Sequence, residues 1–103
     1  MNKKYKVLYL PLFEDDLSKA IDYISIKLNN PKAALKLIDN VEKAIIKRQA
    51  SPLSFEAYKS ITNRKDTYYR IYVGNFTIFY VVIGNIMEVR RFIYNKRQLA
   101  ELV

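Results

Sequence analysis

The sequence predicts an α+β fold: an N-terminal strand, an antiparallel helical hairpin, a three-stranded antiparallel meander and a short C-terminal tail. Two observations place the meander, because Gly74-Asn75 and Gly84-Asn85 each separate two runs rich in Tyr, Phe, Ile and Val. A third places the helices, because Asn30-Pro31 divides two stretches with helical spacing of apolar residues. With the N-terminal strand paired to the meander, the sheet has four strands, and the helical hairpin covers one of its faces.

The meander falls within the stretch from Tyr68 to Arg97, YYRIYVGNFTIFYVVIGNIMEVRRFIYNKR. Two-residue Gly-Asn loops are typical of β-hairpins, because the turns that match strand twist need a positive φ angle, which glycine adopts readily. The chain has only two glycines, and both stand in these loops. The segment 76–83 between them is apolar on both faces, which predicts the central strand.

The first fifty residues predict one strand and two helices. Residues 4–10 alternate in polarity as a strand does, and Pro11 ends that pattern. Asn30 is expected to cap the second helix, with Pro31 at its first position, and the short joint makes the two helices antiparallel neighbours. The apolar stripes of the two helices are Phe13, Leu17, Ala20, Ile21, Ile24 and Leu28, then Ala34, Leu37, Ile38, Val41, Ala44 and Ile45.

Length and composition narrow the classes of protein further. A chain of 103 residues fits one domain, taken here as residues 1–103. It has no cysteine and no histidine, which excludes disulfides, thiolate metal ligands and imidazole acid–base chemistry. We therefore expect neither a metal nor a cofactor. No apolar run approaches the ~18 residues of a membrane span, so we expect a cytoplasmic protein that does not engage a membrane.

The formal net charge of +8 points to an anionic partner. RNA, DNA, a membrane surface and an acidic protein all satisfy that description. In the second half of the chain arginine predominates, and its planar guanidinium suits phosphate or carboxylate. A connector with ordinary surface charge is the competing interpretation for the irregular segment 51–66. The cations expected to contact a phosphate or another target are Lys59, Arg64, Lys65, Lys96 and Arg97.

The chain resembles the RelE/ParE superfamily of toxins over nearly its whole length. The resemblance is carried by the order of the elements and by the stretches NPKAA at 30–34, YRIYVGNFTIFY at 69–80 and RFIYNKR at 91–97. It implies the toxin half of a type II toxin–antitoxin system, with a small acidic antitoxin as partner. It also implies one of two activities, since RelE-like members cut mRNA within the ribosome, whereas ParE-like members inhibit DNA gyrase and cut nothing.

The resemblance assigns roles to individual residues. Tyr94 matches the C-terminal tyrosine that YoeB-like nucleases use in catalysis. Arg91 matches an arginine near the end of the last strand, and Arg70 falls at a position that is basic in RelE-like nucleases. Lys96 and Arg97 match the basic pair that follows the last strand in both branches.

Two positions depart from the nuclease pattern. Thr77 stands where an arginine is usual in the third strand, and Ile93 stands where YoeB-like enzymes have histidine. No tyrosine follows Tyr94 either. These departures favour a ParE-like inhibitor of gyrase. A RelE-like ribosome-dependent endoribonuclease, with Tyr94, Arg91 and Arg70 as its catalytic set, is the alternative, and an inactive antitoxin-binding relative is a third.

Cleaving RNA through its own 2′-hydroxyl requires a proton acceptor, a proton donor and cations around the phosphate. Without histidine, Tyr94 or Lys96 would have to take a proton, helped by neighbouring arginines that lower its pKa. Arg90 and Arg91 are adjacent in a predicted strand and point to opposite faces, so at most one joins a given site, and we choose Arg91. Glu88 is expected to pair across the strands with an arginine instead of acting as a base.

Overall fold

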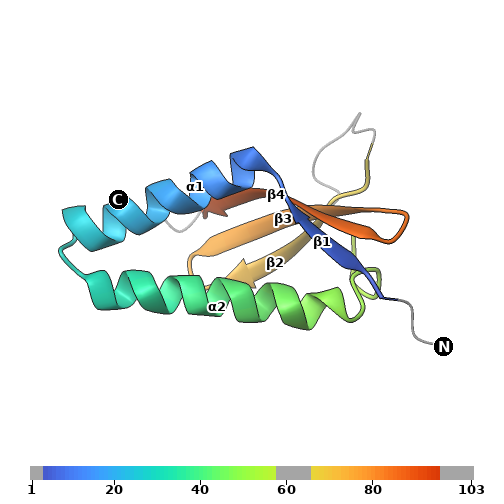
Figure 1. Cartoon of the computed structure of the whole chain (residues 1–103), viewed down its shortest axis with the longest axis horizontal. Helices are drawn as coiled ribbons and strands as arrows, with labels where there is room; N and C mark the ends of the chain where they lie inside the picture. The colour runs from blue at the N-terminus through green and yellow to red at the C-terminus, as the bar shows by residue number, and fades with distance from the viewer. Residues whose placement is uncertain (1–3, 58–65, 96–103) are drawn as a thin grey trace.

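A computed structural model of the chain describes residues 4–57 and 66–95 and confirms the α+β fold (Figure 1). Two helices lie side by side over one face of a four-stranded sheet. The predicted tail from residue 96 onward lies outside the described residues. The elements are β1 (Lys6–Tyr9), α1 (Pro11–Asp22), a π-helical turn η1 (Tyr23–Lys27), α2 (Pro31–Gln49), β2 (Tyr69–Val73), β3 (Phe76–Ile83) and β4 (Ile86–Tyr94).

The sheet has the order β1-β4-β3-β2, so the two ends of the described chain meet in it. β2, β3 and β4 form the predicted antiparallel meander. β1 joins this meander beside β4, and the pairing is parallel, from Lys6 opposite Ile86 to Tyr9 opposite Val89. β3 is an inner strand, as its apolar composition on both faces predicts.

Both Gly-Asn pairs form two-residue hairpin loops, as predicted. Gly74 has a φ of 57° and Gly84 a φ of 61°. The asparagine that follows each glycine has an ordinary negative φ, which is the pattern of a type II′ turn. A Cβ added at either glycine would meet no atom within 4 Å, so only the backbone angle demands glycine there.

This angle leads to a prediction for Gly84→Ala. Alanine at a positive φ places its Cβ against its own backbone, so we expect a loss of about 1–2 kcal/mol in the free energy of unfolding. Urea denaturation followed by circular dichroism measures it. Asn85→Ala, one residue along with a negative φ, is the control and should change stability much less. Equal losses in both variants would contradict the role given to the backbone angle.

The core lies between the helical hairpin and the sheet. Phe13 of α1 and Val41 and Ile45 of α2 are each at most 2% exposed, and they pack on the side chains of β2, β3 and β4 that face them. Ile78 and Tyr80 of β3 are fully buried. The predicted stripes supply most of this contact, since Leu17, Ala20, Leu37 and Ala44 pack at its margin. Leu28, predicted in the first stripe, is exposed instead, because the chain leaves helical geometry there.

The turn between the helices follows the predicted cap. Asn30 Oδ1 accepts a hydrogen bond of 3.1 Å from the Ala33 N–H, and Pro31 is the first residue of α2. The end of the first helix was not predicted: it widens into η1, whose last bond runs from the Leu28 N–H to the Tyr23 carbonyl, five residues back. Asn29 then takes a φ of 51° to reverse the chain.

The last turn of α2 is hydrogen-bonded toward both edges of the sheet, β2 and β1. Arg48 Nη1 donates to the carbonyl oxygen of Arg70 at 3.1 Å and to the Tyr80 hydroxyl at 2.9 Å. The Tyr80 hydroxyl in turn donates to the Pro52 carbonyl at 2.7 Å. Towards the other edge, Gln49 Nε2 donates to the Tyr5 carbonyl just before β1, at 2.6 Å. The bond from Tyr80 to Pro52 thereby ties the segment that follows α2 to β3.

β4 contains a bulge that the sequence does not signal. Phe79 of β3 pairs with Arg91, but its neighbour Tyr80 pairs with Val89. Arg90 is therefore the extra residue, and it changes which side chains of β4 face the core. Before the bulge the buried residues are Met87 and Val89, and after it the buried residue is Phe92.

Among the described residues, none of the helices is long and apolar enough to cross a membrane.

Candidate target-binding site

The arginine chosen from the sequence, Arg91, is engaged by a carboxylate of the first helix. Its Nε donates to Asp16 Oδ2 at 2.7 Å and its Nη2 donates to Asp16 Oδ1 at 3.1 Å, a two-pronged contact. The Phe92 backbone N–H donates to Asp16 Oδ2 at 3.0 Å. Asp16 therefore binds both a side chain and the backbone of β4, and Arg91 is not presented alone to an anion.

Asp16 also completes the edge of the sheet. β1 pairs with β4 only as far as Val89, and its last contact is the Leu10 N–H bound to the Val89 carbonyl at 3.0 Å. Beyond that point the chain turns into α1, so Phe92, which pairs with Ile78 of β3 on one side, has no β1 residue beside it on the other. The Asp16 carboxylate supplies the acceptor that a longer β1 would have offered. A capped edge of this kind is a poor template for another strand.

Asp16 is charged in the folded protein. Burial alone would raise its pKa, but the hydrogen bonds from Arg91 and the Phe92 N–H, together with the charges of Arg91 and Lys19, leave the pKa of Asp16 below its ordinary value. The same contact raises the pKa of Arg91. Both groups are therefore ionised at neutral pH.

Arg90 lies in a second, separate cluster of ion pairs. Its Nε and Nη2 bind Glu88 Oε1 at 2.8 and 2.7 Å, and its Nη1 binds Asp66 Oδ2 at 3.1 Å and the Tyr68 hydroxyl at 2.9 Å. Burial disfavours the charged guanidinium, but the contacts with Tyr68 and Glu88 outweigh it and raise the pKa of Arg90. Glu88, one member of this cluster, is the register partner of Val81, which is only 1% exposed.

The two arginines occupy different clusters, but the prediction that they point to opposite faces is wrong. The bulge places both of them between Val89 and Phe92, which face the core, so neither arginine points to the core side. Glu88 pairs with an arginine, as expected, although the partner lies two residues along the same strand and not across strands. Asp66 and Glu88 are the two acids in the basic stretch from residue 59 to residue 97, and both are used by Arg90.

Arg70 lies on the sheet face turned away from the helices. In register, Arg70 pairs with Phe79 and Phe79 pairs with Arg91, so the three form one row across β2, β3 and β4. The Arg70 guanidinium lies 5.4 Å from the centre of the Tyr72 ring, an attractive cation–π distance. Tyr72 is 62% exposed. The row places Arg70 and Arg91 two strands apart.

Tyr94 belongs to the other face of the sheet. It pairs with Phe76, whose side chain packs on the core, and the two rings meet edge to face with centres 5.4 Å apart. Because side chains alternate along a strand and cross-strand partners share a face, Tyr94 is on the face opposite to Phe79 and Arg91. The structure does not bring Tyr94, Arg91 and Arg70 together.

The two departures from the nuclease pattern are structural contacts. Thr77 is 4% exposed, and its hydroxyl donates to Asn95 Oδ1 at 2.6 Å. Ile93 pairs with Thr77 in the register of β3 and β4. The Asn95 backbone N–H donates to the Asn75 carbonyl at 2.8 Å, so the end of β4 is tied to the first hairpin loop. The longer side chain of an arginine at position 77 would have to fit in the buried space that the Thr77 side chain occupies.

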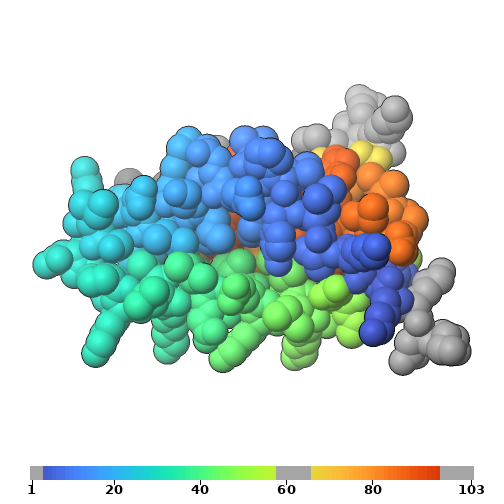
Figure 2. Space-filling model, in the orientation of Figure 1, coloured from blue at the N-terminus to red at the C-terminus, as the bar shows by residue number. Residues whose placement is uncertain are grey.

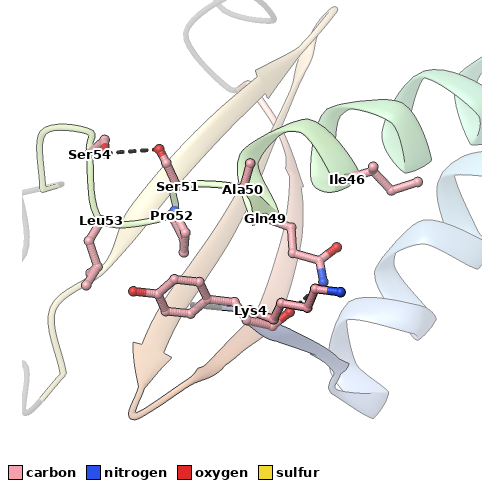
Figure 3. Close-up of a pocket in the computed structure, with 9 residues that line it drawn as sticks. Lys4, Ile46, Gln49, Ala50, Ser51, Pro52, Leu53 and Ser54 are labelled. Carbon is pink, nitrogen blue, oxygen red and sulfur yellow. Dashed lines mark hydrogen bonds between the residues drawn. The ribbon is translucent and has the colours of Figure 1, made fainter. Parts of the chain in front are cut away.

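The remaining predicted cations lie outside the described residues; these are Lys59, Arg64, Lys65, Lys96 and Arg97. Within the described part, a hollow of about 740 Å³ opens between the end of α2 and the start of β1 (Figure 3). Ile46, Pro52 and Leu53 give it an apolar wall, with Lys4 and Gln49 beside them. Neither the sequence nor its contacts assign it a ligand. Residues 4–57 and 66–95 contain no group of acidic side chains suited to a metal ion.

Comparison with known proteins shows to which toxin family the chain belongs. A model of the family described as "ParE toxin of type II toxin-antitoxin system, parDE" matches residues 7–99. The chain belongs to the ParE toxin family. The match covers every described helix and nearly all of every strand, so the family assignment applies to the whole fold and not to one motif.

Two solved structures have the same fold as this ParE-family chain, and a third aligns with a TM-score below 0.5. A structure titled "Chromosomal ParDE TA system from P. aeruginosa" aligns with a TM-score of 0.74 over 90% of this chain and 98% of that one, at 14% identity. YafQ from E. coli strain BL21(DE3) aligns with a TM-score of 0.53 at 11% identity, over 92% and 98% of the two chains. A RelB-RelE complex from Methanococcus jannaschii gives a TM-score of 0.48 at 23% identity, over 93% and 99%. No curated protein sequence matches.

Proposed function

We propose that this ParE-family toxin stops growth by binding DNA gyrase and does not cleave RNA. The observation that carries the proposal is the separation of the groups a nuclease would need. Tyr94 packs against Phe76 on the helix-covered face of the sheet, while Arg91 is held by Asp16 and falls in the row of the opposite face. A proton acceptor and a cation that stabilise one phosphate must lie within hydrogen-bond reach of a common point.

The proposal assigns the target contact to cations other than the paired ones. Arg90 and Arg91 are engaged by carboxylates, which reduces their attraction for a further anion. Lys59, Arg64, Lys65, Lys96 and Arg97 are the proposed contacts with gyrase. The proposed partner in the resting cell is a small acidic antitoxin, and the proposed location is the cytoplasm, where toxin, antitoxin and gyrase meet.

Two assays on one purified preparation test this function. We expect the protein to abolish supercoiling by DNA gyrase while transcripts on translating ribosomes keep intact 5′ ends. Tyr94→Phe should inhibit gyrase as the wild type does, because the proposal gives the hydroxyl no chemical role. Codon-phased cuts that disappear in Tyr94→Phe would establish the RelE-like alternative. If the folded protein neither inhibits gyrase nor cuts transcripts, the remaining hypothesis is that it is an inactive relative that only binds an antitoxin.

Growth assays supply the cellular counterpart. Expression of the chain alone should arrest bacterial growth, and co-expression of the small acidic protein encoded next to it should restore growth. Normal growth with folded toxin in the cell extract would contradict the proposal.

A further inference from the structure

The end of the helical hairpin that carries η1 presents apolar side chains to solvent. Tyr23 is 55% exposed, Ile26 75% and Leu28 55%, and Leu35 near the start of α2 is 68% exposed. This end reaches past the sheet and forms the left end of the molecule in Figures 1 and 2. η1 and α2 contact one another there. The hairpin tip, defined as residues 23–36, is therefore an apolar projection.

The backbone of the tip pairs most of its own hydrogen-bond donors. Three N–H groups of the turn donate to carbonyls of η1 at 3.0 to 3.2 Å; they are those of Leu28, Asn29 and Asn30. Asn30 then accepts from Ala33 with its side chain, at 3.1 Å, and from Ala34 with its carbonyl, at 3.2 Å. Pro31 has no N–H. Six of the seven residues from 28 to 34 therefore need no acceptor outside the tip.

Internal pairing of this kind suits a surface that leaves water for a lipid environment. An N–H group without an acceptor is costly there, because acyl chains offer none, whereas a protein partner can supply acceptors of its own. The π-helical end of the first helix contributes directly, since its wider turn brings the Leu28 N–H to the Tyr23 carbonyl, five residues back. The apolar side chains of the tip can thus be buried with most nearby donors already paired.

The charge around the tip is positive on balance. Its cations are three exposed lysines that form no ion pair with another described residue: Lys27, Lys32 and Lys36. Aspartates stand at both ends of this stretch, Asp22 and Asp39. Asp39 is engaged by Lys43 at 3.0 Å, so Asp22, exposed at the end of α1, is the acid left to oppose the three lysines. A positive excess beside exposed apolar groups favours an anionic surface.

We propose that the hairpin tip docks on the surface of a bilayer that contains anionic phospholipids. Ile26 and Leu28 enter the interface, and Tyr23 lies at the level of the headgroups, where tyrosine is enriched. The lysines extend their ammonium groups to the lipid phosphates. The expectation that the chain does not engage a membrane rests on the lack of a spanning segment, which contact with a surface does not need. The proposal goes beyond the action on gyrase and is independent of it.

Other occupants fit these observations less well. Nucleic acid would pair with the lysines but would gain nothing from the exposed aliphatic side chains. A second copy of the chain, packed tip to tip, would bring together two sets of three lysines with only Asp22 of each copy to offset them. An acidic protein could meet both kinds of group, and it is the principal alternative in the experiment.

Insertion of the tip can be followed by fluorescence. The chain has no tryptophan, so a single introduced indole reports its own surroundings. The emission of Ile26→Trp should shift to shorter wavelength when the full chain is mixed with vesicles of equal parts phosphatidylcholine and phosphatidylglycerol, and should not shift with phosphatidylcholine alone. Ile46→Trp is the matched control, because Ile46 is 65% exposed at the other end of α2, and its emission should stay unchanged.

Co-sedimentation with the same vesicles measures partitioning of the chain. Ile26→Ser and the double variant Lys32→Gln/Lys36→Gln should each lower the partition coefficient about tenfold, because they remove an inserted side chain and two charges near the lipid. Lys4→Gln/Lys47→Gln removes the same charge at the opposite end of α2 and should change the coefficient about twofold or less. Circular dichroism should show that all these variants, altered at exposed positions, are folded.

Several results would overturn the proposal. The wild type might stay in the supernatant with phosphatidylglycerol vesicles, the emission of Ile26→Trp could remain fixed, or the two lysine pairs could weaken partitioning equally, which would indicate attraction by net charge alone. Tighter binding of a glutamate-rich leucine helix than of vesicles, lost in Ile26→Ser, would replace the lipid with an acidic protein. A concentration-dependent dimer that Ile26→Ser abolishes would replace it with a second copy. None of these measurements involves gyrase, so the proposed function is tested separately.

Discussion

Replacing Asp16 by alanine is expected to lower the free energy of unfolding by about 2–4 kcal/mol. The carboxylate is only 13% exposed and has three hydrogen bonds, two from the Arg91 guanidinium and one from the Phe92 N–H. Its removal leaves a cation and a strand-edge donor without their acceptor at the boundary between α1 and β4. Urea unfolding at pH 7 gives the number directly.

The neighbouring residue supplies the control. Asp15 is one position earlier on α1, and its ion pair with Lys19 is more than half exposed on both sides. Exposed pairs of this kind contribute little, so Asp15→Asn should change stability by about 0.5 kcal/mol or less. If Asp15→Asn and Asp16→Asn had equal effects, the capped edge would not be a stabilising feature of this fold.

The effect of Asp16 also has a defined dependence on pH. Its pKa is lowered in the folded state, so its contribution is fully present above the ordinary carboxyl range near pH 4. The contribution disappears as pH falls through the lower, folded-state pKa. The stability difference between wild type and Asp16→Asn should therefore be constant above about pH 5 and shrink below it. A difference that grows on acidification would have the wrong sign.

Two variants, Asp16→Ala and Arg91→Ala, separate two roles for Arg91. If Arg91 holds α1 to β4, Asp16→Ala and Arg91→Ala should lose stability and growth arrest together. If Arg91 instead binds a phosphate, Asp16→Ala should free its guanidinium and keep or increase growth arrest. Measuring growth arrest at matched amounts of folded protein distinguishes the two outcomes.

The second large effect is expected for Tyr80→Phe, a change of one buried oxygen. The hydroxyl accepts from Arg48 Nη1 and donates to the Pro52 carbonyl. Phenylalanine fills the same space but leaves the buried Pro52 carbonyl without its donor, which should cost about 1–3 kcal/mol. Thermal unfolding should show the loss, and hydrogen exchange should show weaker protection at the end of α2.

Tyr72→Phe is the matched control, because Tyr72 is 62% exposed. It should change stability by about 0.5 kcal/mol or less.

Burial raises the pKa of Tyr80, partly opposed by Arg48. Its neutral form is therefore stabilised by folding, and that contribution is lost as pH rises above about 10 through the folded-state pKa. Tyr80→Phe should lose less stability than the wild type over this alkaline range. Unchanged stability at neutral pH would show that Arg48 and Pro52 find other partners.

The sequence predicts the elements of this fold because their signals are local. Gly74 and Gly84 need positive φ angles, and Asn30 needs only the next turn of helix to act as a cap. These requirements are satisfied within a few residues, and each was found as predicted. The parallel pairing of β1 with β4 has no such signal, because the partners are eighty positions apart.

The candidate site was less predictable, because its contacts join residues that are far apart in the sequence. The acids near Arg91 in sequence are Glu88 and Asp66, but the one that binds it is Asp16, 75 residues away. The bulge at Arg90 has no glycine to mark it, although it decides which residues of β4 face the core. A stripe of apolar residues predicts which face of a helix is buried but does not reveal where the helix widens, so η1 was missed. The role of the basic residues from Lys59 to Lys65 stays a prediction.

The parallel pairing of β1 with β4 has a consequence for synthesis of the toxin. β1 is made before the other strands, and β4, its neighbour in the sheet of the described residues, is made after them. A nascent chain interrupted before residue 86 has a helical hairpin but an open sheet and an unpaired leading strand. Closure of the sheet must therefore wait until β4 has been made, and fragments that end before β4 should be substrates for proteases.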